Sequence, residues 1–555
     1  MSEKIKITVV TGIEKPNGVD GSTNIGNLTL TQESAMTLMP LLLKNHLMDG
    51  SFCGGRGDCG RCVVQFLKGA PLPTGLERSR LEPEELRQGY RLACVTRPKA
   101  DCTIRMVETE QEEIPIVTEI NLLSENIDLI GRKNGLSENQ KPVDMKSTIK
   151  SSDGGEKNGC YIIAVDLGTT TVAMQLRNAD TGETADTYCE RNPQQRYGAD
   201  VLARIQASVD GQGEELRRLV CGVILRGLGQ FWEYLRGKGI LCMCIAGNTV
   251  MEHLLLGYDV ASLGRAPFVP VETGLQKIAA DRLLAGIGNL PENPQGMDGE
   301  GIFGFPVYIA PCISAFVGGD VVAGLYALGL LSGGRSEDRG QAVLFIDLGT
   351  NGEMAVTDGQ RMIVTATAAG PAFEGDGTMI GTDRIALTAR LLGRGILDET
   401  GLLEEPYFTE GVRIEDGKKD VESGNQNKNV HYIKQEDIRA LQMAKAAVRA
   451  GVEILWERMG RPAIEKVFLA GGFGYYLDVE AAVAIGLLPA YMRGRVQAVG
   501  NTSLAGAYEL GRDLSFDRTA GGWLEERTVL AESVNLAETE EFERLYLKYM
   551  GLEEN

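Results

Sequence analysis

Four cysteines near the start of the sequence are spaced like the ligands of an iron–sulfur cluster. Cys53, Cys59 and Cys62 follow one another as C-x5-C-x2-C, and Cys94 comes after a long gap. The first step is one residue wider than in the plant-type pattern of [2Fe–2S] proteins. Glycines between the cysteines let the backbone turn its N–H groups toward the sulfurs, which offsets the negative charge of a cluster. We expect these four thiolates to hold a [2Fe–2S] cluster, so that electrons enter or leave the protein here.

The same cysteines are also compatible with a structural zinc site or with unpaired thiols in a core. Zinc sites usually contain two short C-x2-4-C pairs, whereas this stretch has one, Cys59 with Cys62. The flanking residues must form the scaffold. Residues 4–10 alternate as a strand does, a helix follows Thr37, and residues 103–107 can close the sheet. This order resembles the ferredoxin β-grasp fold.

Two turns farther along the chain are suited to phosphate. Asp166-Leu-Gly-Thr-Thr170 follows an apolar strand, and Asp347-Leu-Gly-Thr-Asn-Gly-Glu353 repeats the phrase later. Such a hairpin turn offers backbone N–H groups and hydroxyls to a phosphate, while its aspartate can hold Mg²⁺ through waters. The repeat predicts two similar lobes, each of which begins with this hairpin.

A third turn, Ala470-Gly-Gly-Phe-Gly474, follows a buried strand and is suited to a nucleoside. Its glycines leave room for a flat base and a ribose against the backbone. The phrase Gly-Asn-Thr also occurs twice, at 247–249 before an expected helix and again at 500–502. One such turn alone is most often plain hairpin chemistry, but the three in this order indicate a nucleotide-binding fold.

The composition bounds the possible functions. The chain has 555 residues, of which 43% are apolar, and a formal net charge of −20. This suits several packed units and argues against a general nucleic-acid binder, which would need a basic face. No apolar run approaches the length of a transmembrane helix and the N-terminus is charged, so we expect a cytoplasmic protein. The remaining cysteines lie in apolar patterns typical of reduced core residues: Cys102, Cys160, Cys189, Cys221, Cys242, Cys244 and Cys312.

The three turns resemble the phosphate-1, phosphate-2 and adenosine motifs of the actin, sugar-kinase and Hsp70 superfamily of ATPases. Joined to an N-terminal [2Fe–2S] domain, the architecture is similar to that of the reductive activators of corrinoid proteins. Further phrases fit that family: Asn192-Pro-Gln-Gln-Arg-Tyr-Gly-Ala-Asp200, Ala246-Gly-Asn-Thr249 and Gly370-Pro-Ala-Phe-Glu-Gly375.

The resemblance implies a multidomain α/β chain. A ferredoxin-like β-grasp domain occupies residues 1–108, and a two-lobed, RNase H-like ATPase occupies residues 159–333 and 341–526. A C-terminal helix is expected within 527–555. Residues 109–158 are polar enough for a linker, either a mobile tether or a plain spacer. Longer members of the family carry an additional middle domain there, which has no counterpart in this sequence.

The family's activity, as the resemblance implies it, is the ATP-dependent return of an oxidised Co(II) corrinoid to Co(I). The corrinoid belongs to a partner protein or methyltransferase, an upstream low-potential donor supplies the electron, and the activator is a homodimer. The implied cofactors are a [2Fe–2S] cluster, ATP and Mg²⁺. The histidines do not form an Asp-x-His-x-x-Gly signature, so we expect the corrinoid to be the partner's.

Residue roles follow from the matching motifs. We expect Asp166 and Asp347 to bind Mg²⁺ through waters, and we prefer Glu353 to Glu374 as the group that orients the attacking water. Phosphate is expected at Gly168, Thr169, Thr170, Gly349, Thr350 and Asn351, and the adenosine at Gly471, Gly472 and Gly474.

Other functions remain open from the sequence alone. One is an ATP-coupled electron donor to a non-corrinoid enzyme, another is a redox-sensing ATP-binding module without turnover, and a third is a small-molecule kinase. A P-loop signature is absent from the sequence, which disfavours P-loop hydrolysis. G-x-G-x-x-G occurs at Gly55–Gly60 and at Gly299–Gly304, but neither copy joins an expected strand to a helix, which disfavours dinucleotide binding.

Overall fold

The computed structural model describes residues 4–11, 26–45, 47–48, 62–81, 83–107, 159–198, 200–235, 238–287, 304–331, 341–349, 351–373, 381–414, 431–517 and 519–553. These residues form two compact units, one within Met1–Glu113 and Arg191–Val220 and the other within Ile114–Glu190 and Cys221–Asn555. Several expected features lie outside the described residues, namely Cys53, Cys59, Thr350, Glu374 and the linker 109–158.

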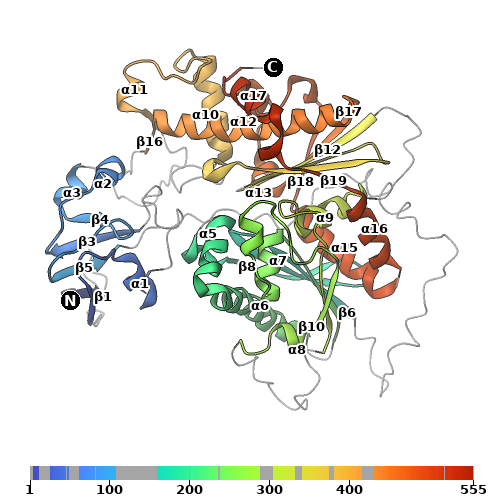
Figure 1. The fold of residues 1–555 in the computed structure, drawn as a ribbon, viewed down its shortest axis with the longest axis horizontal. Coiled ribbons are helices and arrows are strands. Elements are labelled where there is room, and N and C mark those ends of the chain that lie inside the picture. Colours follow the sequence, from blue (N-terminus) through green and yellow to red (C-terminus); the bar gives the residue numbers. More distant parts are fainter. Residues whose placement is uncertain are drawn as a thin grey trace, which may run out of the picture. The chain divides into compact units, whose positions relative to one another are not determined.

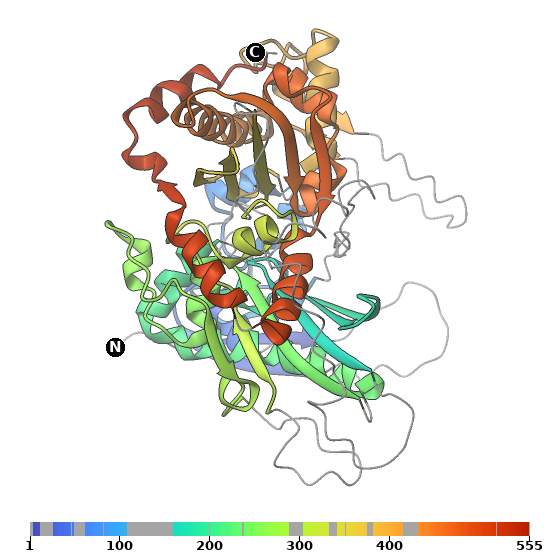
Figure 2. The same cartoon turned by 90° about the vertical axis from the view of Figure 1, so that its right-hand side faces the viewer.

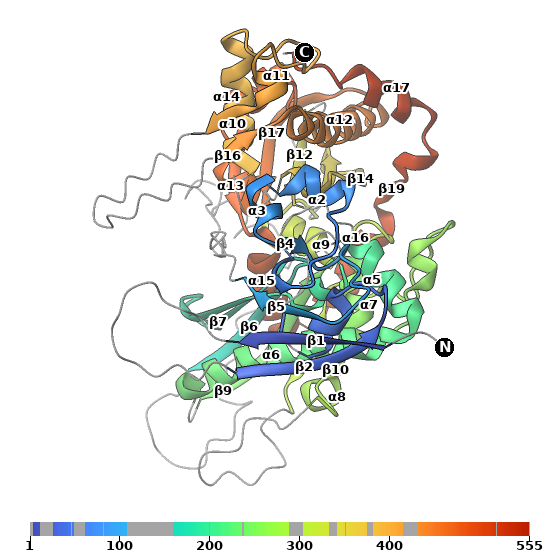
Figure 3. The ribbon, with the colours of Figure 1, turned by 90° about the vertical axis from the view of Figure 1, so that its left-hand side faces the viewer.

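The first unit contains a five-stranded sheet in the order β2-β1-β5-β3-β4. The β1–β5 pair is parallel, and the β1–β2 and β3–β5 pairs are antiparallel. Strands β1 and β2 lie side by side in Figure 3. Ile5, Ile7 and Val9 are buried, as the alternation predicts, and Met39 and Leu42 of the short helix α1 join the same core. The strands are β1 Lys4–Thr11, β2 Gly26–Glu33, β3 Val63–Lys68, β4 Tyr90–Leu92 and β5 Cys102–Met106.

The helices of this unit are short. Those of its first segment are α1 Met39–Lys44, α2 Gly75–Arg80 and α3 Pro83–Arg87. The second segment contributes η2 Pro193–Tyr197 and α5 Val201–Ala207. Asn192 caps η2 and Asp200 caps α5 through side-chain oxygens, which explains both ends of the family phrase at 192–200 as structural residues.

The second unit contains two six-stranded sheets with the same strand order, β10-β11-β9-β6-β7-β8 and β18-β17-β12-β13-β14-β19. In each, an antiparallel hairpin lies beside a parallel strand that the chain reaches later, so the repeated sequence phrase corresponds to a repeated fold. The first sheet consists of β6 Cys160–Leu167, β7 Thr171–Asn178, β8 Thr184–Arg191, β9 Gly239–Gly247, β10 Gln276–Ala279 and β11 Pro306–Ile309. The second consists of β12 Gln341–Leu348, β13 Asn351–Thr357, β14 Met362–Ala368, β17 Ala463–Ala470, β18 Val496–Gly500 and β19 Glu532–Val534.

Helices cover both sheets of this unit. They are α6 Gly213–Leu235, whose first residues belong to the first unit, α7 Thr249–Leu256, α8 Ala280–Leu283, α9 Gly319–Ala327, α10 Gly381–Gly393, α11 Tyr407–Glu410, α12 Gln435–Arg458, α13 Gly471–Tyr476, α14 Val479–Ala484, α15 Thr502–Phe516, α16 Ala520–Leu530 and α17 Glu540–Lys548. A small hairpin, β15 Val412–Ile414 with β16 His431–Ile433, lies in the same unit.

The helices α9 and α15 pack against each other between the two sheets (Figures 1 and 2). The core there joins residues of both sheets, such as Ile162 and Phe345, to Val321 and Leu504 of the helices. The chain reaches α15 after the second sheet, but α15 also packs against β6 and β9 of the first sheet, so the two lobes share this helix layer.

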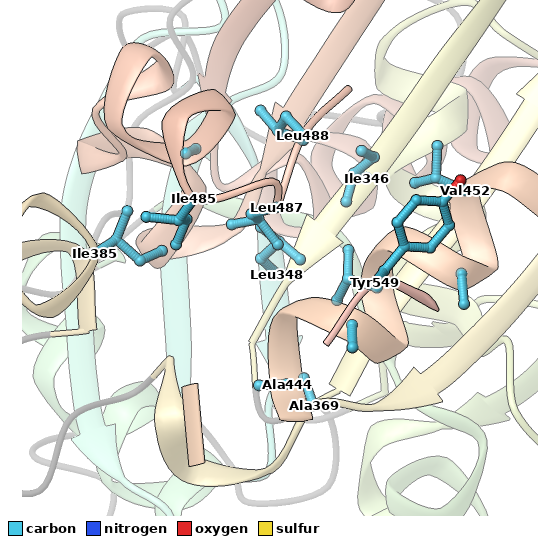
Figure 4. Packing of buried hydrophobic residues seen from close by; sticks show 14 of the residues in the cluster. Ile346, Leu348, Ala369, Ile385, Ala444, Val452, Ile485, Leu487, Leu488 and Tyr549 are labelled. Carbon is cyan, nitrogen blue, oxygen red and sulfur yellow. The ribbon is translucent and has the colours of Figure 1, made fainter. Parts of the chain in front are cut away.

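A second core fills the outer face of the second sheet. Ile346 and Leu348 of β12 pack with Val452 of α12, Ile485 and Tyr549 (Figure 4). The long helix predicted at 436–459 is thus confirmed as α12, whose buried face covers this sheet.

Two details differ from the sequence-based expectations. The glycine turn at 471–474 is the first part of a helix, α13, because the chain turns directly into helical conformation after Gly471. The strand β19, which pairs with β14, extends the second sheet past residue 526, the end suggested for this lobe. The cysteines expected in the core are buried, apart from the half-buried Cys189. Among the described helices, none is both long and apolar enough to cross a membrane.

Candidate functional site

The two phosphate-type turns open onto one cavity of about 280 Å³ between the lobes of the second unit. Each turn connects a buried strand to its antiparallel partner, β6 to β7 and β12 to β13. The cavity is lined by Asp166, Gly168, Thr169, Thr170, Thr171, Ala173, Asn248, Asp320, Val321, Asp347, Leu348, Gly349, Asn351, Glu353, Phe373, Thr382, Gly471, Gly472, Phe473, Tyr476, Asn501 and Ser503. Nearly all expected nucleotide residues among the described ones therefore meet at one place.

Among the residues that the structure describes, four carboxyl groups line this cavity, namely those of Asp166, Asp320, Asp347 and Glu353. Burial, reinforced by neighbouring carboxylates, raises the pKa values of Asp320 and Asp347 to about 7. The same causes raise the pKa of Glu353 well above its usual value. Like charges at this spacing disfavour one another, and a divalent cation with oxygen ligands would relieve the repulsion. Among the described residues no three acidic, histidine or cysteine side chains converge closely enough to hold a metal ion directly, so this set suits only a hydrated cation that is bound through waters.

Asp320 is a cleft residue that sequence reasoning missed. It is the second residue of α9, directly after Gly318 and Gly319. A side chain at Gly319 would lie 2.2 Å from the Glu252 carboxyl group, and one at Gly318 would collide with the turn at Asn248. The glycine pair thus allows α9 to begin against the β9–α7 turn and to present Asp320 to the cavity. Two glycines followed by an acidic residue at a helix start were the available signal.

Asp166 is held by residues at the start of α15, a helix that follows the second sheet in the chain but packs against β6 and β9 of the first. Its Oδ2 accepts a hydrogen bond from Asn501 Nδ2 at 2.8 Å, and its Oδ1 accepts one from Ser503 Oγ at 2.9 Å. Burial raises the pKa of Asp166, and these two hydrogen bonds oppose that increase. The sequence showed the Gly-Asn-Thr phrase at 500–502 but gave no indication that it reaches Asp166.

The glycine segment at the start of α13 lies behind Asp347. Gly471 has φ +81°, and a Cβ there would lie 2.5 Å from Asp347 Oδ1 and 3.0 Å from the Leu348 carbonyl oxygen. Gly471 and Gly472 line the cavity, whereas Gly474 is buried against Leu469. The role expected of the first two glycines is thus consistent with their position, and Gly474 serves helix–strand packing.

Aromatic side chains border the same end of the cavity. The rings of Phe373 and Phe473 have centroids 4.8 Å apart, and Tyr476 lines the wall beside them. Phe373 follows β14 and Phe473 lies in α13, so the pair forms only when the chain is folded. A flat base could pack on such rings.

Two of the four expected cluster ligands are described, and they lie together in the first unit. Cys62 and Cys94 are buried with their Sγ atoms 3.1 Å apart, and the Cys94 N–H points to Cys62 Sγ at 3.5 Å. This separation is too long for a disulfide. Two converging thiols with a backbone N–H directed at sulfur fit a shared iron, as the expected [2Fe–2S] ligation requires.

A buried carboxylate braces the turn that carries Cys94. Glu77 is 1% exposed and accepts hydrogen bonds from Thr74 N at 2.7 Å, Leu92 N at 3.0 Å and Thr96 Oγ1 at 2.5 Å. Leu92 and Thr96 lie on the two sides of Cys94. Glu77 therefore fixes both ends of this turn, a role that its capping-box spacing from Thr74 shows only in part.

Replacing Glu77 with alanine is expected to destabilise the first unit by roughly 2 kcal/mol, because buried donors lose their acceptor. Iron content should fall, and the cluster's visible absorption should disappear at lower urea concentration than in the wild type. Glu84→Ala is the matched control, since Glu84 is an exposed residue of the same unit that pairs with Arg87 on the surface. Equal urea midpoints for the two variants would contradict the bracing role.

Comparisons with known proteins agree with this geometry. A profile described as "RACo middle region" matches residues 161–332, and one described as "C-terminal domain of RACo the ASKHA domain" matches 341–384 and 378–555. A third, "2Fe-2S iron-sulfur cluster binding domain", matches residues 24–99.

Individual proteins give the same picture. The chain is 31% identical over 400 residues to "Corrinoid activation enzyme RamQ" of Eubacterium limosum, which covers 62% of this chain and 63% of that protein. It is 24% identical over 450 residues to "[Co(II) methylated amine-specific corrinoid protein] reductase" of Methanosarcina barkeri, covering 70% of this chain and 76% of that protein. A solved structure, "Reductive activator for corrinoid,iron-sulfur protein", superposes with a TM-score of 0.59 at 25% identity over 99% of this chain and 98% of the other.

These matches confirm the ferredoxin-like and ASKHA fold class expected from the sequence. They place a [2Fe–2S] cluster-binding domain before a nucleotide-binding ASKHA domain. Since profiles of two RACo regions match residues 161–332 and 341–555, the chain belongs to the RACo family.

Proposed function

We propose that this protein uses Mg·ATP to reduce the Co(II) corrinoid of a partner protein to Co(I), with one electron per cobalt. The observation that carries the proposal is the convergence of both phosphate turns and four carboxyl groups on one interlobe cavity. The names of the relatives supply the acceptor, because they act on corrinoid proteins. The [2Fe–2S] cluster, held by Cys62 and Cys94 together with Cys53 and Cys59, would supply the electron.

ATP is required for an energetic reason. A plant-type [2Fe–2S] centre has a reduction potential of about −400 mV. Transfer of one electron to an acceptor whose potential is lower by 100 mV costs about 2.3 kcal/mol. The family resemblance implies that the Co(II)/Co(I) couple is lower still. ATP binding or hydrolysis would supply the missing free energy by closing the lobes, altering the docked partner and removing a ligand from its cobalt.

The chain's own residues have separate tasks in this proposal. Asp166, Asp347 and Asp320 would hold the hydrated Mg²⁺, and the turns at Gly168–Thr170 and Gly349–Asn351 would bind the phosphates. Glu353 lies in the cavity directly after the second phosphate turn, where its carboxyl group would orient the attacking water. Gly471, Gly472 and the Phe373–Phe473 pair would receive the nucleoside.

The remaining expectations belong to the same proposal. A low-potential protein or reductant would deliver electrons to the first unit, the protein would act as a homodimer, and its place would be the cytoplasm. These follow from the family resemblance and from the sequence, which has no apolar run of transmembrane length.

The test follows the cobalt spectrum anaerobically after mixing the protein, a Co(II) corrinoid protein, reductant and ATP. We expect Co(I) only when ATP is present, and we expect Cys62→Ser to abolish its formation. Co(I) formation that proceeds equally without ATP would contradict the proposal. ATP binding without repeated turnover would instead identify a redox-sensing module.

A further inference from the structure

The carboxylate of Asp166 lies at the end of β6, and its hydrogen-bond donors come from the start of α15, which packs against β6 and β9. Asn501 and Ser503 begin α15, which follows strand β18 of the second sheet. Asn501 has a double task, because its Oδ1 accepts from Leu504 N at 2.8 Å as a helix cap while its Nδ2 donates to Asp166. The cap fixes the amide orientation, so the donor is already aimed at the carboxylate.

The chemistry of these donors suits a metal-binding carboxylate. Each carboxylate oxygen has two lone pairs, and the hydrogen bonds from Asn501 and Ser503 use one on each oxygen. One lone pair per oxygen remains for the waters of a hydrated cation. Because both donors are neutral, they orient Asp166 without cancelling the negative charge that attracts the cation.

The repeated fold shows that this arrangement is particular to α15. Ser503 is the second residue of α15, and the equivalent second residue of its partner helix α9 is Asp320. A hydroxyl at one position orients Asp166, whereas a carboxylate at the other adds charge beside Asp347. The two halves of the cleft thus have the same fold but carry different side chains at this equivalent position, a carboxylate in α9 and a hydroxyl in α15.

We propose that Asn501 and Ser503 are positioning residues which hold Asp166 in its magnesium-binding orientation. Because α15 packs against β6 and β9, both donors are fixed on the same sheet that carries Asp166. Without these donors the carboxylate is free to rotate away from the hydrated cation. This inference rests on the proposed function as an Mg·ATP-dependent activator.

The experiment measures ATP binding to the full chain by fluorescence titration over a range of Mg²⁺ concentrations. Ser503→Ala and Asn501→Ser are expected to raise the half-saturating Mg²⁺ concentration about tenfold, as loss of partners around a metal site commonly does. Asn501→Ser keeps a good helix cap while it removes the donor to Asp166. Ser503→Thr retains the hydroxyl and should restore the wild-type requirement.

Asp478→Ala is the matched control for helix capping. Asp478 caps α14 by accepting from Ala481 N at 3.1 Å, and it is not among the residues that line the cavity. Its magnesium requirement should equal that of the wild type although a cap is lost. If the wild type needs Mg²⁺ but Ser503→Ala and Asn501→Ser need no more of it, the positioning role is wrong. Wild-type ATP binding that is independent of Mg²⁺ would overturn the proposed function itself.

Discussion

Replacing Gly471 with alanine is expected to lower Mg·ATP hydrolysis by at least about 100-fold, because a misplacement of about 1 Å at a catalytic group has effects of this size. The added Cβ would lie 2.5 Å from Asp347 Oδ1, which is inside van der Waals contact, and the backbone at φ +81° already disfavours a side chain. Either Asp347 or the start of α13 must move. Both belong to the wall of the nucleotide cavity, so phosphate release under saturating Mg²⁺ and ATP measures the effect.

Gly460→Ala separates backbone strain from the displacement of Asp347. Gly460 has φ +90°, but its added Cβ would meet no heavy atom within 4 Å. This control should lose stability, by about 1 kcal/mol, and keep its hydrolysis rate. Equal hydrolysis rates for Gly471→Ala and Gly460→Ala would show that close approach of residue 471 to Asp347 does not affect hydrolysis.

The parts of the fold that the sequence predicts well are those with a local physical cause. The alternation of Ile5, Ile7 and Val9 is enough to indicate a strand with one buried face, and structure and sequence agree there. The two hairpin turns can likewise be predicted locally, because each depends on the adjacent residues of an Asp-x-Gly-Thr motif. Asn248 and Asn501 both cap helices, as the repeated Gly-Asn-Thr phrase suggests.

The features that could not be predicted from the sequence depend on contacts between residues that are distant in the chain. Asp166 and Asn501 are separated by 335 positions, and only the packing of α15 against β6 brings them together. In the sequence, Asp320 is not distinguished from other acidic residues at helix starts. Only the position of α9 between the sheets shows that Asp320 lines the cavity. The segment at 471–474 is rich in glycine, which favours a turn locally, but the packing of Gly474 on Leu469 stabilises a helix there. Tertiary packing decided these features.

Replacing Asp347 with asparagine is expected to have opposite effects on activity and on stability. Loss of the carboxylate should weaken Mg²⁺ binding by roughly 10- to 100-fold, since an uncharged amide is a poor partner for the hydrated cation. In the metal-free protein, however, the same change removes a partly buried charge from a group of four carboxyl residues. Steady-state hydrolysis across Mg²⁺ concentrations tests the first effect, and thermal unfolding in EDTA tests the second.

The stability effect should depend on pH in a defined direction. Burial raises the pKa of Asp347 from 3.8 to about 7 in the folded protein. Well below pH 3.8 the carboxyl group is protonated in both states, so its full contribution to stability is present. As pH rises toward 7, the unfolded chain releases the proton first, and the folded protein loses stability until the group ionises there as well. Asp347→Asn lacks this loss, so its advantage in melting temperature should grow between pH 5 and pH 7 and then level off.

Asp398 provides a control of opposite sign. Its carboxylate accepts hydrogen bonds from Thr400 Oγ1 and Leu402 N, which hold its pKa below the usual value. Asp398→Asn should therefore lower the melting temperature slightly at neutral pH and leave it unchanged in acid. Addition of Mg·ATP should reverse the order of wild type and Asp347→Asn, because the cation neutralises the wild-type carboxylates and finds a weaker site in the variant. An Asp347→Asn protein that melts below the wild type in EDTA at pH 8 would show that the carboxylates do not repel one another in the empty cleft.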